Sequence, residues 1–126
     1  MRVVSHGIDM VSIPSIKQLL ETNSAWKLSV YSESERNQSD EPPVDIRYFA
    51  SRFAGKEAVA KALKTGFAGD VTWREIEILR DSGGDPYVKI SGGAERQAVE
   101  MGITEWQISI SYCGEFAIAS VIASGV

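Results

Sequence analysis

Residues 49–66 read FASRFAGKEAVAKALKTG, and this stretch predicts one helix that brings charged groups beside an apolar face. At about 100° per residue, four apolar side chains share one sector and predict the stripe that faces the core: Phe49, Phe53, Ala60 and Leu63. Glu57 and Lys61 lie four residues apart on the flank of this stripe, either as a simple ion pair or as part of a binding site. Lys56 falls inside the apolar sector, so its ammonium must reach solvent, meet an anion or be destabilised by desolvation. Gly66 and Gly69 are expected to end the helix.

Residues 3–11, VVSHGIDMV, predict a first strand that carries Asp9 near its end. This aspartate either caps a helix that should begin around residues 12–14 or points into a site at the end of the strand. His6, the single histidine, lies three residues before Asp9, so strand alternation places the two on opposite faces. We interpret His6 as structural.

The remaining elements are predicted from periodicity and turn residues. They are a helix ending before Thr22, a polar surface excursion over residues 32–45 with Pro42-Pro43, a hairpin of residues 73–79 and 87–90, a helix over 94–101, and strands over 106–112 and 116–123. In the late strand, Ser109 and Ser111 share the face opposite the isoleucines. The order β-α-α-β-β-α-β-β predicts an α+β fold, with an antiparallel sheet and a long central helix in a single domain, 1–126.

Length, charge, cysteine content and hydropathy limit the kinds of protein that this chain can be. A chain of 126 residues suits one domain but is short for enclosing a bulky nucleotide alone, so a site between subunits is attractive. The net charge of −4 argues against a general nucleic-acid binder. Cys113 is the only cysteine, which excludes an intrachain disulfide and fits a reducing, cytoplasmic location. No signal-like segment is found and no apolar run approaches the ~20 residues of a membrane span, so we expect no membrane association.

Four motifs, taken in order, resemble the holo-acyl-carrier-protein synthase family of 4′-phosphopantetheinyl transferases. They are Gly7-Ile8-Asp9, the helix pattern Phe49-x-x-Arg52-Phe53-x-x-Lys56-Glu57-Ala58-x-x-Lys61-Ala62-Leu63-x-Thr65-Gly66, Gly84-x-Pro86, and Ser109-Ile110-Ser111. The resemblance covers nearly the whole chain, from about residue 7 to about residue 122. It implies Mg²⁺-dependent transfer of 4′-phosphopantetheine from coenzyme A to a serine of an acyl carrier protein. It also implies a homotrimer with sites between subunits.

The resemblance further implies roles for particular residues. Asp9 and Glu57 would bind Mg²⁺ and, with Lys61, form the catalytic group, in which Glu57 or a metal-bound water acts as base. Lys61 would also bind the pyrophosphate, and Arg52 the 3′-phosphate of coenzyme A unless it is a surface arginine. The other residues expected to bind coenzyme A are Gly66, Gly84, Pro86, Ser111 and Tyr112.

Two departures keep a second hypothesis open. Tyr112 stands where the family often has a histidine, and a tyrosine supplies no positive charge near neutral pH. The first helix offers mainly Lys17, whereas family members often meet an acidic carrier protein with several arginines. The alternative is therefore a catalytically weakened relative that binds coenzyme A or a carrier protein. A third hypothesis is a structural trimer in which Glu57 and Lys61 pair only with each other.

Overall fold

The structure is a computed structural model that describes residues 1–126. Its elements are β1 (Arg2–Ser12), α1 (Ile13–Thr22), α2 (Ser24–Val30), α3 (Glu33–Asn37), α4 (Asp45–Ala62), the 3₁₀ turn η1 (Trp73–Glu75), β2 (Ile76–Arg80), β3 (Pro86–Ile90), α5 (Gly92–Met101), β4 (Glu105–Cys113) and β5 (Phe116–Gly125). All strand pairs are antiparallel, so the predicted α+β class is confirmed.

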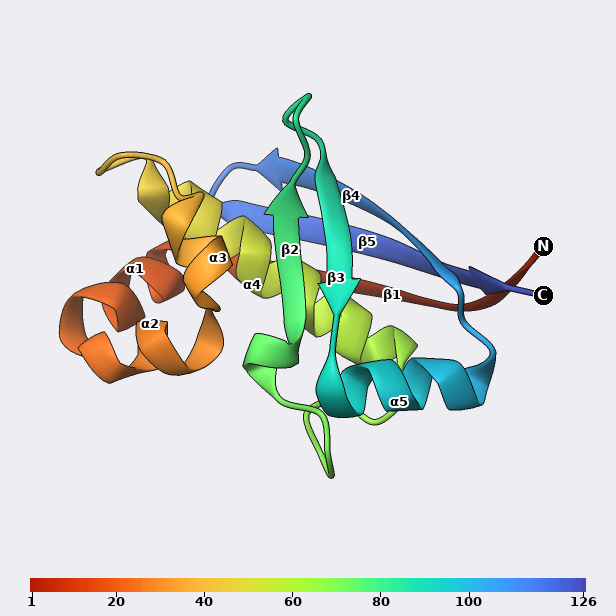
Figure 1. Cartoon of the computed structure of the whole chain (residues 1–126). Helices are drawn as coiled ribbons and strands as arrows, with labels where there is room; N and C mark the ends of the chain where they lie inside the picture. Colours follow the sequence, from red (N-terminus) through yellow and green to blue (C-terminus); the bar gives the residue numbers. More distant parts are fainter.

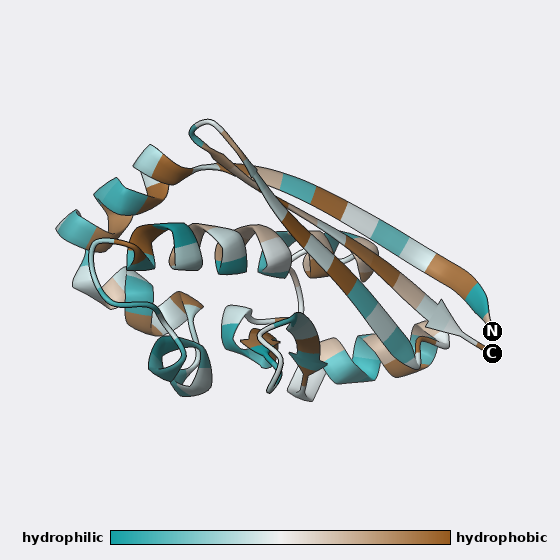
Figure 2. Cartoon of the chain, turned by 90° about the horizontal axis from the view of Figure 1, so that it is seen from above, coloured by the Kyte–Doolittle hydropathy of each residue, from teal (hydrophilic) through white to brown (hydrophobic).

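The strands form two sheets around the long helix α4 (Figure 1). One sheet has the order β1-β5-β4, which places β1 and β4 at opposite edges, and the other is the β2-β3 hairpin. Seen from above, α4 lies between the three-stranded sheet and the layer that holds the hairpin and α5 (Figure 2). None of the helices combines the length and apolar character that a membrane crossing requires.

Helix α4 is buried on almost every side, not only along the predicted stripe. Its alanines let other elements approach closely, and Ala50, Ala54, Ala58 and Ala62 are fully buried. The closest approach is at Gly7 of β1, where an added Cβ would lie 2.0 Å from the carbonyl oxygen of Ala58. A glycine is therefore required where α4 crosses β1. This crossing fixes the position of α4 beside the end of β1.

Two packed clusters surround α4. The larger joins α4 to the sheet, the hairpin and α5, and includes Val59, Leu63, Ile76, Ile78 and Val121. The smaller joins α1 and α2 to the first half of α4 and is rich in aromatic residues, among them Tyr31, Tyr48 and Phe49. The predicted stripe residues Phe49, Ala60 and Leu63 are buried, and Phe53 is half-buried. Together the clusters hold α4 as the scaffold of the molecule.

The surface excursion expected over residues 32–45 was wrong in its first half. Helix α3 begins with a capping box, in which Ser32 and Glu35 satisfy each other's backbone N–H groups. Glu35 is fully buried and forms an ion pair with Lys56 at 2.7 Å, both side chains being inaccessible to solvent. Lys56 therefore has the anionic partner that was the second of its three predicted options, and burial also lowers the pKa of Lys56, which was the third. The sequence reasoning missed this helix because its residues are polar, and Lys56, the residue that pairs with Glu35, lies far from it in the sequence.

The end of α4 also differs from the prediction. The helix stops at Ala62, ahead of both Gly66 and Gly69. Lys64 adopts the left-handed conformation with φ 68°, and the N–H of Gly66 donates to the carbonyl of Ala60 at 3.3 Å. The left-handed position directly after the helix is therefore occupied by Lys64, where a glycine is more usual, and Gly66 contributes only a backbone hydrogen bond to the last turn.

Candidate functional site

The first cluster of polar residues lies where α4 passes the edge strand β1. Lys61 Nζ donates to Asp9 Oδ1 at 2.9 Å and to the carbonyl oxygen of Ile8 at 3.0 Å. The Lys61 side chain is 53% exposed and that of Asp9 only 17%. Ser12, and not Asp9, caps α1 by accepting from the N–H of Ser15. The interpretation of Asp9 as a helix cap is therefore wrong, and its place in a site stays a prediction.

Glu57 completes this cluster electrostatically. Partial burial, followed by the nearby Asp9 carboxylate, raises the pKa of the Glu57 carboxyl, and Lys61 opposes the rise. Lys61 forms its ion pair with Asp9 and none with Glu57, which contradicts the hypothesis that Glu57 and Lys61 pair only with each other. Two carboxylates therefore lie near one ammonium, which pairs with only one of them, and the local negative charge is only partly compensated.

This donor set fits magnesium. No group of three or more His, Cys, Asp or Glu side chains gathers as a ready metal cage. Mg²⁺ is commonly held by only one or two carboxylates, the remaining positions going to water and substrate phosphates. Partial burial raises the pKa of Glu57 most, and the Asp9 carboxylate adds to the rise; a bound cation would relieve this second, repulsive contribution.

A second cluster lies along the other edge strand, β4. A hollow of about 490 Å³ is lined by residues of α4, the β2–β3 hairpin and β4, namely Arg52, Arg80, Gly84, Asp85, Pro86, Ile108, Ser109, Ile110 and Tyr112. It brings together four residues expected to bind coenzyme A: Arg52, Gly84, Pro86 and Tyr112. Arg80 was missed by the sequence reasoning. Its place in the sequence, directly after the strand predicted over residues 73–79 and shortly before Gly84-x-Pro86, could have located it, and the hairpin register does pair Arg80 with Pro86.

Arg52 is an unusual arginine because it is only 5% exposed yet has no carboxylate partner. Its guanidinium lies over the Tyr48 ring, 4.3 Å from the centroid, and Nη1 donates to Ser51 Oγ at 2.9 Å. Its buried Nε has no hydrogen-bond partner. Burial lowers the pKa of Arg52. A buried cation with an unsatisfied donor is costly unless an anion binds to it.

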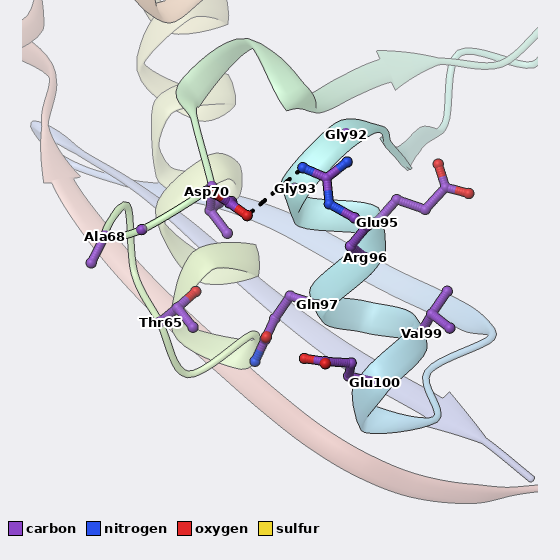
Figure 3. A pocket seen from close by; sticks show the side chains of 12 residues that line it. Thr65, Ala68, Asp70, Gly92, Gly93, Glu95, Arg96, Gln97, Val99 and Glu100 are labelled. Atoms are coloured by element: carbon purple, nitrogen blue, oxygen red, sulfur yellow. Dashed lines mark ion pairs between the residues drawn. The ribbon is translucent and has the colours of Figure 1, made fainter.

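Three of the residues expected to bind coenzyme A lie elsewhere, and one of them, Lys61, belongs to the cluster with Asp9. Ser111 does not line this hollow, and in the β4-β5 ladder it pairs with Ile118 on an exposed stretch of strand. Gly66 follows α4 and lines neither this hollow nor another of about 680 Å³. That other hollow lies between residues 65–71 and α5, with Arg96 and Asp70 paired at 3.9 Å across it (Figure 3). None of the expected site residues lines it.

The two clusters do not meet within one chain. Asp9 lies on β1 and Tyr112 on β4, and β5 separates these edge strands, so two strand spacings, about 10 Å, lie between them. The sheet also exposes large apolar side chains on β1 and β5: Val3 62%, Ile8 59%, Met10 59%, Phe116 41% and Ile122 38%. Such a patch on a small chain is typical of an interaction surface.

The fold and these clusters define an α+β protein with an acidic pair at one sheet edge and an arginine-lined hollow at the other. The family model for the 4′-phosphopantetheinyl transferase superfamily matches residues 5–120. The holo-[acyl-carrier-protein] synthase of Desulforudis audaxviator is 37% identical over 124 residues, covering 98% of this chain and 94% of the relative. That of Alkaliphilus metalliredigens is 39% identical over 118 residues, with coverages of 94% and 96%.

Solved structures give the same result. The holo-[acyl-carrier-protein] synthase of Neisseria meningitidis superposes with a TM-score of 0.83 at 30% identity, covering 98% of this chain and 99% of that one. The Helicobacter pylori enzyme, solved in complex with coenzyme A, gives a TM-score of 0.81 at 28% identity, with coverages of 94% and 99%. This chain belongs to the holo-[acyl-carrier-protein] synthase family of the 4′-phosphopantetheinyl transferase superfamily. The resemblance drawn from the motifs is confirmed.

Proposed function

We propose that residues 1–126 form one phosphopantetheinyl transferase domain, which moves 4′-phosphopantetheine from coenzyme A to a serine hydroxyl of an acyl carrier protein. Membership of the family supports this activity. The observation that carries it is the convergence of Asp9, Glu57 and Lys61 where α4 crosses β1. Asp9 and Glu57 would hold Mg²⁺, which when bound neutralises charge on the pyrophosphate of coenzyme A.

The residues of the chain then have separate tasks. Lys61, half-exposed beside Asp9, donates to a pyrophosphate oxygen and stabilises the charge that grows on the departing 3′,5′-ADP. The carrier serine oxygen forms a bond to the phosphorus of the phosphopantetheine group as the phosphorus–oxygen bond to 3′,5′-ADP breaks. The Glu57 carboxylate, whose pKa burial raises, accepts the serine proton directly or through water.

We assign the arginine-lined hollow to the adenylate end of coenzyme A. Arg52 would bind the 3′-phosphate, because this buried cation has an unsatisfied Nε donor and no carboxylate partner. Gly84, with φ 89°, and Pro86 shape the hairpin turn that borders the hollow, and Tyr112 forms part of its wall. The Bacillus anthracis relative was solved in complex with coenzyme A (3′,5′-ADP), which is consistent with a nucleotide subsite.

We further propose that the active unit is a homotrimer with intersubunit sites. The acidic cluster, formed by Asp9, Glu57 and Lys61, lies at one edge of the sheet, and the arginine-lined hollow lies at the opposite edge. A single chain therefore provides two half-sites. The exposed apolar side chains of β1 and β5 would be covered by neighbouring copies. We expect the enzyme to serve fatty acid biosynthesis in the cytoplasm, where its single cysteine would stay reduced.

A second candidate function is a binding module without turnover. It is favoured by Tyr112, which brings no charge to the nucleotide hollow, and by the scarcity of basic residues in α1. Both features weaken binding without removing Asp9, Glu57 or Lys61. Catalysis therefore remains the better supported function.

Intact-mass spectrometry of apo carrier proteins, incubated with this protein, coenzyme A and Mg²⁺, tests the proposal. We expect one phosphopantetheine to be added to a carrier, and the gain to disappear with EDTA or in Glu57→Gln. Glu95→Gln, which removes an exposed carboxylate from α5, is the matched control and should retain activity. Binding of coenzyme A without modification of any carrier in a broad panel would instead support the binding module.

A further inference from the structure

Tyr112 lines two separate hollows. On one side it lines the arginine-lined hollow described above. On the other it lines a hollow of about 510 Å³ bordered by Ile13, Pro14, Arg47, Gly114 and Glu115. Tyr112 lies near the end of an edge strand and is 39% exposed, so the strand alone does little to fix its ring. The orientation of the Tyr112 ring therefore depends on contacts with neighbouring side chains.

Arg47 provides such a contact. Its guanidinium carbon lies 4.0 Å from the centroid of the Tyr112 ring, well within the ~6 Å range of a cation–π interaction. Arg47 is exposed and forms no ion pair with any carboxylate of the chain. It also sits in the first turn of α4, where the helix dipole disfavours a cation. The face of the Tyr112 ring is therefore the charge-related contact that Arg47 makes within the chain.

Cation–π contacts with a tyrosine ring are also found for two arginines that line the arginine-lined hollow. The guanidinium groups of Arg52 and Arg80 lie over the Tyr48 ring, at 4.3 and 5.0 Å from its centroid. Of these two, only Arg80 also has a carboxylate partner, Asp40 at 3.1 Å. Stacking on a ring face holds a guanidinium in place and leaves its N–H edge free for a planar or tetrahedral anion. Tyrosine rings therefore organise the cations around this hollow.

We propose that Arg47 is a positioning residue for the nucleotide subsite, acting through the ring of Tyr112. The stacked Arg47 guanidinium fixes the orientation of the Tyr112 ring, which lines the arginine-lined hollow together with Arg52. The ligand class is a nucleotide that carries a terminal phosphomonoester, as in the 3′,5′-ADP part of coenzyme A. This inference rests on the proposed function, since it assumes that the hollow takes the adenylate end of that substrate.

Equilibrium binding of 3′,5′-ADP by calorimetry tests it without turnover. Loss of one partly exposed cation–π contact should weaken binding roughly fivefold in Arg47→Ala, with an intermediate effect in Arg47→Lys. Arg96→Ala, which removes an exposed arginine from α5, should bind like the wild type. In turnover assays the KM for coenzyme A should rise by the same factor, and kcat should not change.

A double-mutant cycle separates positioning from direct charge. If Arg47 acts through the ring, its replacement should still weaken binding in Tyr112→Phe but have no further effect in Tyr112→Ala. A persistent effect in Tyr112→Ala, or wild-type affinity in Arg47→Ala, would overturn the inference. Failure of the wild-type protein to bind 3′,5′-ADP would overturn the proposed function as well, which distinguishes the two failures.

Discussion

The ammonium of Lys61 pairs with Asp9, 52 residues away in the sequence, and not with Glu57 on the previous turn of its own helix. The crossing of α4 over β1 at Gly7 produces this choice, because it brings the inward face of the strand against the flank of the helix. Glu57 is left beside a second carboxylate without an ion pair of its own. We therefore expect Asp9 and Glu57 to accept an additional cation.

The electrostatic coupling within this cluster can be measured directly. Because Asp9 raises the pKa of Glu57 and Lys61 lowers it, Asp9→Asn should lower that pKa and Lys61→Met should raise it. Carbon-detected NMR titration of the Glu57 carboxyl in metal-free protein provides the measurement. Identical titration curves in all three proteins would show that the groups are not coupled.

Metal and substrate should bind cooperatively. Mg²⁺ and coenzyme A together should raise the melting temperature more than the sum of their separate effects, because each completes the other's binding site. Asp9→Asn should abolish the part that depends on the metal. Glu95→Gln should keep it, since this carboxylate lies on α5. Strictly additive shifts in the wild-type protein would argue against a shared site.

The buried pair Glu35–Lys56 should dominate local stability. Both side chains are fully buried, and Lys56 also donates to the carbonyls of Trp73 and Ile76. Lys56→Met leaves an unpaired buried carboxylate and should cost about 3–5 kcal/mol in the free energy of unfolding at neutral pH. Urea unfolding followed by circular dichroism measures this cost.

The pH dependence of that variant has a definite sign. Burial already raises the pKa of Glu35, and Lys56 opposes the rise, so removing Lys56 raises it further. The folded state then binds a proton more tightly than the unfolded state. Stability is therefore retained below the unfolded pKa and is lost as pH rises through the folded pKa. Lys56→Met should be markedly less destabilised at pH 5 than at pH 8; equal losses at both would refute this account.

Gly7 should tolerate no side chain. The Cβ of Gly7→Ala would lie 2.0 Å from the carbonyl oxygen of Ala58, and neither backbone can move without separating α4 from β1. We expect a loss of at least about 1–3 kcal/mol in stability, the usual cost of overpacking. Catalytic activity should fall as well, since Asp9 lies on the same strand. Gly83→Ala is the matched control, because its Cβ would meet only Asp81 Oδ1 at 3.4 Å.

Much of the fold could be predicted because its signals are local. The alternation in residues 3–11, the apolar spacing of residues 49–63 and the turn residues after Arg80 each act over a few neighbours, and the structure has a strand, a helix and a hairpin there. Helix α3 was missed, although Ser32 and Glu35 carry a capping-box pattern. Its stability depends on Lys56 and the N–H of Ile78, which are distant in sequence.

The candidate site divides in the same way. The sequence by itself determined which residue types are present, including the two carboxylates and Lys61, because motif spacing on one strand and one helix is a local property. Only the tertiary structure decided the partners: Asp9 for Lys61, Glu35 for Lys56, Arg47 for Tyr112, and a hollow that includes Arg80 but not Ser111. Those choices depend on strand register and on the close crossing of α4 over β1, which arise from packing between segments far apart in the chain.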